Sequence, residues 1–333
     1  MRIIIPMAGQ GKRLRPTTLT VHKPLIPIAG KSIVRRLSEK IAGSLPHTIT
    51  DIGYVVRDID QATETELLAL AESIGAQGHI FHQNEPLGTA HAILCARPLL
   101  DGPVTIAFAD TLFYADISIA PQDDGVIWVK KVEDPRQYGV VVTNEELIIE
   151  RFEEKPETFV SDLAIIGIYY FKDGRYLAEE LQYLLSHDIR TKGEYQLTDA
   201  MEHMRQKGRR LRAGIVDEWL DCGNRTTLLH TLRRVLEREL STGYVDPSAS
   251  IEDSVLIPPY YVGPNATVRR AVIGPGVSIE EAAHITDSLL RESLIFAGAD
   301  VQNIIGKQSV VGRSSQWKGW PASTHISDYS ICE

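Results

Sequence analysis

The sequence of 333 residues has little cysteine and no long apolar run. Its three cysteines, Cys95, Cys222 and Cys332, are odd in number and widely spaced, which argues against a disulfide framework and against a zinc site. No apolar run approaches the ~18 residues of a membrane-spanning helix, and the chain enters an apolar run at once, which leaves no room for a signal peptide. We therefore expect a cytoplasmic protein with reduced thiols that does not bind membranes.

The chain also lacks an excess of basic residues. Asp and Glu total 44 against 35 Lys and Arg, a formal net charge of −9. Nucleic-acid binding needs a basic face, so we expect no nucleic-acid partner. Local groups of cations can still bind phosphate in an acidic protein, so the charge balance does not exclude a phosphorylated small molecule. The length predicts about two domains with a large core.

The most informative segment is residues 3–28, which read IIIPMAGQGKRLRPTTLTVHKPLIPI. The pattern predicts a buried strand, then a loop with glycines and cations, then a lysine in a second apolar run. Backbone N–H groups at Gly9 and Gly11 can approach an anion closely because glycine has no Cβ. Arg13 and Lys23 add positive charge. The segment matches neither the Walker A loop nor the dinucleotide fingerprint, so it predicts a phosphate site of another type.

This segment resembles the signature of the sugar-1-phosphate nucleotidyltransferases, also called nucleotide-sugar pyrophosphorylases. In that family the loop reads Gly-x-Gly-x-Arg-Leu-x-Pro-x-Thr and is followed by Lys-Pro-Leu-hydrophobic-Pro. The matching residues here are Gly9, Gly11, Arg13, Leu14, Pro16, Thr18, Lys23, Pro24, Leu25 and Pro27. The resemblance covers residues 1–225. It implies that a nucleoside triphosphate and a sugar-1-phosphate react to give a nucleotide-sugar and pyrophosphate.

The pattern of elements fits this reading. Strand-like and helical segments alternate up to about residue 112, including a helix at 89–100, which predicts a parallel sheet covered on both faces. Such sheets bind ligands at the carboxyl ends of their strands, where the loops 8–18 and 84–88 lie. Strand-like runs dominate from 126 to 171. We therefore predict an α/β fold with a Rossmann-like, mixed and mainly parallel sheet.

The pattern changes after residue 250. Aliphatic residues recur every five or six positions, at Ile251, Ile257, Val262, Val268, Ile273, Ile279, Ile285, Leu290, Ile295 and Val301. This hexapeptide period predicts a short left-handed parallel β-helix of roughly three coils, against the alternative of a plain β-rich domain. The predicted parts are a catalytic domain at 1–225, a linking helix at 226–245, the β-helix at 246–313 and a tail at 314–333. We expect the β-helix to mediate assembly into a homo-oligomer.

The resemblance implies roles for residues on the triphosphate side. Arg13 would bind the β- and γ-phosphates, and Lys23 would reach the α-phosphate, where charge builds up during the reaction. The implied nucleotide contacts are Ala8, Gly9, Gly11, Gln83, Pro86, Gly88 and Thr89. Gln83 and Gly88 would face the base, because an amide can donate and accept at once.

A second group of residues is implied for the sugar phosphate. Glu154-Lys155-Pro156 matches the Glu-Lys-Pro of the family, which assigns Lys155 a catalytic role in holding the phosphate of the sugar-1-phosphate. The implied sugar contacts are Tyr138, Gly139, Glu154, Lys155 and Glu194. A solvated run of charges around Lys155 and a helix-terminal acid at Glu194 are the simpler alternatives.

The resemblance further implies Mg²⁺ as cofactor, bound by Asp110 and Asp221. Magnesium takes few protein carboxylates and completes its coordination with phosphate oxygens and water. Both motifs depart from the family: its Gly-Asp-Asn reads Ala109-Asp110-Thr111 here, and Asp221 is followed by Cys-Gly-Asn instead of Thr-Gly-Thr. Without the family resemblance, each aspartate would be interpreted as a helix cap or a turn residue.

Several substrates remain open. The chain most resembles the glucose-1-phosphate thymidylyltransferases that carry a C-terminal β-helix, which implies dTTP and glucose-1-phosphate. Uridylyltransferases for glucose-1-phosphate share the string Gln-Leu-Thr-Asp-Ala, and mannose-1-phosphate guanylyltransferases also carry such a β-helix. Alternatives from other classes are a non-catalytic nucleotide-sugar-binding regulatory protein and an acetyltransferase with His284 as its base.

Overall fold

The computed structural model describes residues 1–45, 47–115 and 117–320. Cys332 and the tail from residue 321 onward lie outside this range. The chain folds into two compact units. One contains Met1–Ile26 and Ser32–Asn224, and the other contains the short segment Pro27–Lys31 and the chain from Arg225 onward. Among the described residues, no helix is long and apolar enough to cross a membrane.

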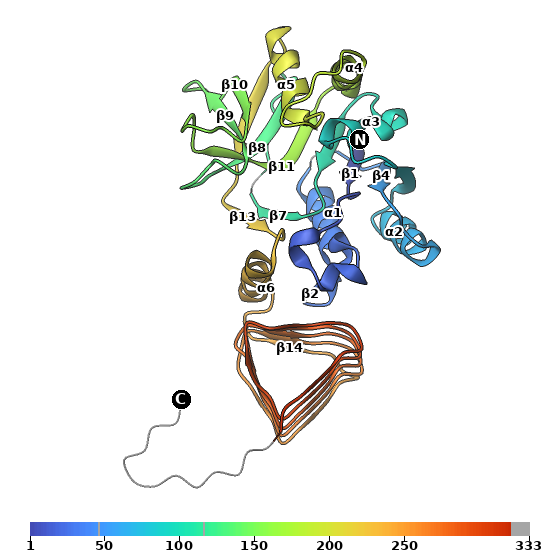
Figure 1. Ribbon diagram of the computed structural model, residues 1–333, viewed down its shortest axis with the longest axis vertical. Helices are drawn as coiled ribbons and strands as arrows, with labels where there is room; N and C mark the ends of the chain where they lie inside the picture. The colour runs from blue at the N-terminus through green and yellow to red at the C-terminus, as the bar shows by residue number, and fades with distance from the viewer. Residues whose placement is uncertain (46, 116, 321–333) are drawn as a thin grey trace. The chain divides into compact units, whose positions relative to one another are not determined.

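A nine-stranded mixed sheet forms the centre of the first unit (Figure 1). Four neighbouring strands are parallel and lie in the order β5-β4-β1-β6. Their bounds are β1 Arg2–Pro6, β4 Asp51–Val56, β5 Gln77–His82 and β6 Val104–Ala107. The rest of the sheet is joined to β6 through the antiparallel strand β11. Its strands are β8 Gly125–Lys131, β9 Gly139–Thr143, β10 Ile149–Glu154, β11 Leu163–Phe171 and β12 Leu211–Ile215.

The strand order reverses direction at β1. From β1 the chain adds β4 and β5 on one side, then crosses over to place β6 on the other side. Such a switch point leaves a crevice at the carboxyl ends of the two strands. The run Ile3, Ile4 and Ile5 is fully buried, as expected for a strand covered on both faces. The phosphate-loop segment follows β1, and Asp110 follows β6, so the fold brings both to this crevice.

Helices and a small second sheet complete the first unit. The helices are α1 Ile33–Ser44, α2 Gln61–Ser73, α3 Thr89–Cys95, α4 Gly174–Ser186 and α5 Leu197–Gln206. The two-stranded sheet pairs β7 (Thr111–Tyr114) with β13 (Glu218–Asp221). The predicted helix at 89–100 is too long, since α3 ends at Cys95 and a 3-10 turn follows at Arg97–Leu99. Pro98 lacks the N–H that would continue the helix.

The second unit is a helix followed by a triangular parallel β-helix (Figure 1). The helix is α6, Arg225–Glu239. Three sheets of stacked short strands follow, in the orders β14-β17-β20-β23-β26, β15-β18-β21-β24-β27 and β16-β19-β22-β25. The strands of the first sheet are β14 Tyr244–Val245, β17 Tyr260–Val262, β20 Val277–Ile279, β23 Leu294–Ile295 and β26 Val310–Val311. Those of the second are β15 Ser250–Glu252, β18 Thr267–Arg269, β21 His284–Thr286, β24 Asp300–Gln302 and β27 Gln316–Lys318. Those of the third are β16 Val255–Leu256, β19 Val272–Ile273, β22 Leu289–Arg291 and β25 Ile305–Lys307. The predicted fold class, a mixed α/β sheet followed by a parallel β-helix, is confirmed.

The β-helix is larger than the roughly three coils that the aliphatic period predicts. Two of its sheets have five strands and one has four. The inward position of the first predicted coil is Leu256, which packs against the core, whereas the prediction chose Ile257. The final coil was missed because Gly306 and Trp317 replace aliphatic residues there. A Cβ on Gly306 would lie 2.8 Å from Trp317 Cη2, so the glycine makes room for the indole.

Candidate active site

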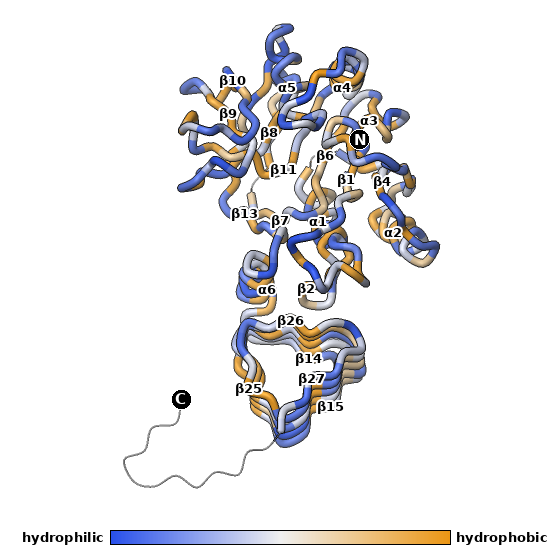
Figure 2. The backbone as a smooth tube through the Cα atoms, in the orientation of Figure 1, coloured by the Kyte–Doolittle hydropathy of each residue, from blue (hydrophilic) through white to orange (hydrophobic). Residues whose placement is uncertain are grey.

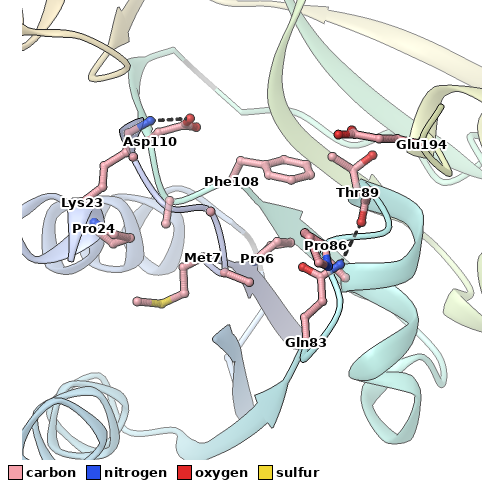
Figure 3. Close-up of a pocket in the computed structure, with 16 residues that line it drawn as sticks. Pro6, Met7, Lys23, Pro24, Gln83, Pro86, Thr89, Phe108, Asp110 and Glu194 are labelled. Carbon is pink, nitrogen blue, oxygen red and sulfur yellow. Dashed lines mark hydrogen bonds and ion pairs between the residues drawn. The ribbon is translucent and has the colours of Figure 1, made fainter. Parts of the chain in front are cut away.

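A cavity of about 290 Å³ opens where β1 and β6 end (Figure 3). Its lining residues are Pro6, Met7, Ala8, Gly9, Gly11, Lys23, Pro24, Gln83, Pro86, Gly88, Thr89, Ala92, Phe108, Ala109, Asp110 and Glu194. All residues predicted to contact the nucleotide are in this lining, together with Lys23, Asp110 and Glu194. The remaining predicted residues are outside the lining: Arg13, Tyr138, Gly139, Glu154, Lys155 and Asp221.

The phosphate-loop glycine Gly11 adopts a conformation that other residues avoid. Its φ of +59° is left-handed, and a Cβ there would lie 3.0 Å from Thr18 Cγ2 and 3.2 Å from Lys23 Cβ. Thr18 Oγ1 donates a hydrogen bond of 2.8 Å to the Gly11 carbonyl. Gly11 therefore packs directly against the segment that carries Thr18 and Lys23.

Lys23 forms an ion pair with the carboxylate that follows β6. Its Nζ lies 2.8 Å from Asp110 Oδ2 (Figure 3). The Lys23 side chain is only 11% exposed, whereas that of Asp110 is 41% exposed. A short 3-10 turn, Lys23–Leu25, holds the lysine backbone, with Pro24 buried beneath it. A largely buried cation thus stands next to a carboxylate that still has an accessible oxygen.

Strand pairing brings Asp221 to the same place. Asp221 on β13 is in register with Thr111 on β7, so the two aspartates are near neighbours although they are far apart in sequence. The backbone N–H of Cys222 donates to the Asp110 carbonyl at 2.9 Å. Arg13 is close as well, because a Cβ on Gly223 would lie 3.1 Å from Arg13 Nη2 and 2.9 Å from Asp221 Oδ1.

These carboxylates fit a hard divalent cation. Asp110 Oδ2 accepts a hydrogen bond from Lys23, and Asp221 Oδ1 accepts one from the Gly223 N–H. Oxygen ligands suit magnesium, which typically binds one or two carboxylates together with phosphate oxygens and water. Across residues 1–45, 47–115 and 117–320, no group of three or more His, Cys, Asp or Glu side chains is placed to bind a metal.

At the other end of the cavity, Gln83 is fixed by two contacts of its amide nitrogen. Nε2 donates to the Gly88 carbonyl at 3.0 Å and lies 3.1 Å from His91 Nδ1. A carbonyl only accepts hydrogen bonds, so the atom facing Gly88 must be the amide nitrogen. The amide oxygen is turned toward Pro6 (Figure 3). Gln83 therefore offers the cavity an acceptor, and not the donor-acceptor pair expected from the sequence.

Gly88 is required by the backbone of a distant segment. It has a φ of +117°, and a Cβ there would overlap the Tyr195 carbonyl oxygen and lie 2.7 Å from the Tyr195 nitrogen. The Tyr195 N–H donates to the Leu87 carbonyl, and the Ala90 N–H donates to the Tyr195 carbonyl, both at 2.9 Å. This close approach places Glu194 on the wall of the cavity.

The predicted sugar-side residues form a neighbouring cluster. Glu154 Oε2 accepts a hydrogen bond of 2.7 Å from Thr198 Oγ1, and a Cβ on Gly139 would lie 3.0 Å from the same oxygen. Lys155 Nζ lies 3.4 Å from Glu154 Oε1. Lys155 also has a φ of +46°, a conformation that is costly for a side-chain-bearing residue and often marks a functional position.

Tyr138 connects this cluster to the region of Asp221. Its ring packs edge-on against Trp219, with 4.9 Å between centroids. Burial raises the pKa of its hydroxyl, the nearby Asp221 charge raises it further, and Arg13 opposes the shift. The electrostatic influence of both groups shows that Arg13, Asp221 and Tyr138 lie in one region of the first unit.

Comparisons with known proteins decide the family. Residues 2–238 match the sequence pattern of the family described as nucleotidyl transferase. The chain belongs to the sugar-1-phosphate nucleotidyltransferase family.

Individual relatives agree with this assignment. This nucleotidyltransferase is 27% identical over 351 aligned positions to the glucose-1-phosphate thymidylyltransferase of Streptomyces griseus, covering 98% of this chain and 96% of that protein. It is 35% identical over 182 positions to the mannose-1-phosphate guanylyltransferase catalytic subunit beta of Danio rerio, covering 51% of this chain and 49% of that protein. A nucleoside-diphosphate-sugar pyrophosphorylase from Vibrio cholerae RC9 shares the fold, with a TM-score of 0.61 and 20% identity over 69% of this chain and 99% of that chain.

Sequence reasoning missed several residues of the nucleotidyltransferase site. Met7 and Phe108 line the cavity, but in the sequence each belongs to an ordinary apolar run. Thr198 was unexpected as the partner of Glu154. His91 contacts the Gln83 amide. Each of these assignments depends on contacts between distant segments, for which a single sequence carries no signal.

Proposed function

We propose that this nucleotidyltransferase transfers a thymidylyl group from dTTP to glucose-1-phosphate and releases pyrophosphate. The observation that carries the proposal is the arrangement within one cavity of the phosphate loop, the Lys23–Asp110 pair and the Gln83 acceptor. The near-full-length similarity to a glucose-1-phosphate thymidylyltransferase supports these substrates.

The reaction brings two anions together, so charge neutralisation and positioning are the main catalytic tasks. The oxygen of the sugar phosphate attacks the α-phosphorus of the nucleotide, and the bond from the α-phosphorus to the oxygen of the departing pyrophosphate breaks. Lys23, held at the mouth of the loop, is suited to stabilise the charge that develops on the α-phosphate. Arg13 would bind the β- and γ-phosphates and the leaving pyrophosphate.

Asp110 and Asp221 are the residues that would hold the metal. Nucleotidyltransferases of this family generally use a divalent metal, and the all-oxygen donor set favours Mg²⁺. When bound, the ion would neutralise phosphate charge. Lys23 would then keep Asp110 oriented and provide a second positive charge beside the phosphates.

The sugar phosphate is assigned to the neighbouring cluster. Lys155 would bind the phosphate, while Glu154, the Gly139 backbone, Tyr138 and Glu194 would contact the sugar. Glu154 is already oriented by Thr198, so it can accept from a sugar hydroxyl without reorganising. Orientation of the attacking oxygen by these contacts would lower the barrier by positioning.

The Gln83 oxygen limits the choice of base. Thymine, uracil and guanine present a ring N–H on the edge that pairs, whereas cytosine and adenine present a ring nitrogen that only accepts. Because Gln83 offers an acceptor, we infer that this oxygen pairs with the ring N–H of the base, so that dTTP, UTP and GTP bind productively. Cytosine and adenine could reach the same oxygen only through an exocyclic amine, in a shifted position, so we expect CTP and ATP to bind less well.

The test is pyrophosphate release from dTTP, UTP, GTP, CTP and ATP, each paired with glucose-1-phosphate and with mannose-1-phosphate. We expect the highest kcat/KM for dTTP with glucose-1-phosphate and at least about 10²-fold lower values for CTP and ATP. Equal turnover of CTP and dTTP would contradict the role of Gln83. Binding of nucleotides by calorimetry with no turnover of any pair would favour a non-catalytic regulatory protein instead.

A further inference from the structure

One face of the β-helix carries a row of outward aliphatic side chains. Parallel pairing places Val255 beside Val272, Val272 beside Leu289, and Leu289 beside Ile305. The next residue in each strand points into the core, as Leu256, Ile273 and Leu290 do, so these four point outward. We call Val255, Val272, Leu289 and Ile305 the aliphatic ladder. Its two ends are 57% and 89% exposed, at Val255 and Ile305 respectively.

The second face shows what a solvated surface of this β-helix looks like. Outward positions in the sheet β15-β18-β21-β24-β27 are occupied at the same register by polar residues. They are Ser250, Thr267, His284, Asp300 and Gln316. In Figure 2 the tube is orange beside the β25 label and blue along β27, with the colours of inward and outward residues alternating along each strand. Five coils of polar residues on one face show that an aliphatic row is not a requirement of the fold.

On the third face of the β-helix, outward side chains are covered by another segment of the chain. In the sheet β14-β17-β20-β23-β26, the outward residues include Tyr261, Ser278 and Leu294. Ser278 and Leu294 are completely buried. A Cβ on Gly30 would overlap Tyr261 Oη, so the segment Pro27–Lys31 of the same unit lies directly against this face. Within the described residues, Trp320 borders the groove at the aliphatic ladder, but it is itself 91% exposed and does not bury the ladder as Pro27–Lys31 buries the third face.

We propose that the aliphatic ladder is the contact surface of a homodimer, packed against the same ladder of a second copy with the order of coils reversed. Large exposed apolar patches on soluble proteins mark interaction sites. A two-fold axis parallel to the strands, passing between β19 and β22, would place Val272 against Leu289 of the partner subunit and Val255 against Ile305 of the partner subunit. Such an isologous contact closes at two copies.

Charges along the edge of the ladder match this arrangement. Asp253, Arg270, Asp287 and Asn303 stack at one corner, with φ values of +46°, +46°, +50° and +56°, and border the same groove as the ladder. Their sequence of signs is negative, positive, negative and neutral. Reversal of the coil order brings Arg270 opposite Asp287 of the partner subunit, and Asp287 opposite Arg270 of the partner subunit. A second copy is therefore complementary in charge as well as in apolar surface.

The first test is the molar mass of the full-length protein in sedimentation velocity, with and without Leu289→Lys. We expect a dimer for the wild type and at least a 100-fold weaker association for Leu289→Lys, because a lysine would be buried against the partner's ladder. Thr267→Lys, on the polar face, is the matched control and should remain dimeric. Circular dichroism checks that both variants are folded.

A charge-mixing experiment tests the reversed coil order. Arg270→Asp alone places two acids opposite each other, and Asp287→Arg alone places two arginines opposite each other, so both variants should shift toward monomer. An equimolar mixture should recover the dimer, since each subunit then meets the opposite charge in its partner. The Arg270–Asp287 ion pair within one chain, at 2.7 Å, is lost in both variants and cannot be restored by mixing.

Three results would overturn the proposal. The first is a monomeric wild type, and the second is a mixture that associates no better than either single variant. The third is a wild type that dimerises only after residues 321–333 are removed, which would show that this segment occupies the ladder.

Discussion

Lys23 Nζ donates a hydrogen bond of 2.8 Å to Asp110 Oδ2 across 87 positions of sequence. The lysine comes from the segment that follows the phosphate loop, and the aspartate comes from the end of β6. The pair therefore joins the two strands at which the sheet reverses its direction. Because each charge is held by the other, both are in place before phosphate arrives, and little reorganisation is needed when it does.

Replacement of Lys23 should affect the chemical step more than binding. We expect Lys23→Met to lower kcat by about 10²–10³-fold, the range found when one preorganised group is removed from a developing charge. Steady-state kinetics with both substrates varied would measure the effect. Lys12→Met, which removes an exposed cation from the same loop outside the cavity lining, should change kcat less than about threefold. Similar losses for the two variants would show that only the net charge of the loop matters.

Removal of either aspartate should weaken metal activation. We expect Asp110→Asn and Asp221→Asn each to shift the midpoint of the Mg²⁺ dependence to at least tenfold higher concentration, since each removes a charged oxygen ligand. The readout is initial rate against Mg²⁺ concentration at saturating nucleotide. Asp217→Asn, an exposed acid immediately before β13, serves as control. An unchanged midpoint for Asp221→Asn would remove it from the metal site.

Gly88 should tolerate no side chain. Gly88→Ala combines a φ of +117° with a clash against the Tyr195 backbone, so we expect a loss of several kcal/mol of unfolding free energy and a raised KM for nucleotide. Gly75→Ala provides a matched comparison, because Gly75 has a φ of +84° with nothing within 4 Å of a built Cβ. It should cost only about 1 kcal/mol. Chemical denaturation of the two variants would measure the difference, and equal losses would contradict the close approach of Tyr195.

We expect Asp199 to lower the unfolding free energy as pH rises, which is opposite to the usual effect of an aspartate. Burial raises the pKa of its carboxyl, the neighbouring charge of Glu154 adds to the shift, and Thr191 and His203 oppose it. Its Oδ2 has no hydrogen-bond partner. A raised pKa favours the protonated form in the fold, so the unfolding free energy falls as pH rises from the unfolded pKa through the folded one. Asp199→Asn removes this penalty.

Thermal unfolding between pH 2 and pH 7 tests this expectation, because the contribution of Asp199 changes above the unfolded pKa of an aspartate and that of Asp188 changes below it. The Tm of Asp199→Asn relative to wild type should increase as pH rises. Asp188→Asn should behave in the opposite way, because a hydrogen bond from Tyr195 and the pairing with Arg190 lower the pKa of Asp188. That stabilisation is present above the unfolded pKa and is lost as pH falls through the folded one. Parallel Tm profiles for the two variants would contradict the assigned environments.

The sequence was sufficient for features that are local along the chain. We could identify the first strand from the apolar run Ile3, Ile4 and Ile5, and the phosphate segment from the glycines that follow it. Both patterns consist of consecutive residues, so they are visible in the sequence alone. Periodicity likewise predicted the β-helix. It missed the coil at Trp317, since the space inside is filled by one indole opposite Gly306 instead of two aliphatic side chains.

Features that depend on distant contacts were beyond prediction. The orientation of the Gln83 amide is set by the Gly88 carbonyl and His91, and the need for glycine at Gly88 is set by Tyr195. The aliphatic ladder spreads over four coils, with 16 or 17 residues between neighbours, and becomes visible only when strand register aligns its members. None of these relationships leaves a local signal in the chain.

The most direct test of the central claim is to quantify both products of one reaction. Wild-type protein is incubated with dTTP, glucose-1-phosphate and Mg²⁺, and dTDP-glucose and pyrophosphate are measured over time. We predict that the two accumulate in equal amounts, and that Lys23→Met slows both together. Release of pyrophosphate without nucleotide-sugar, or the absence of both products with every nucleotide, would contradict nucleotidyl transfer at this site.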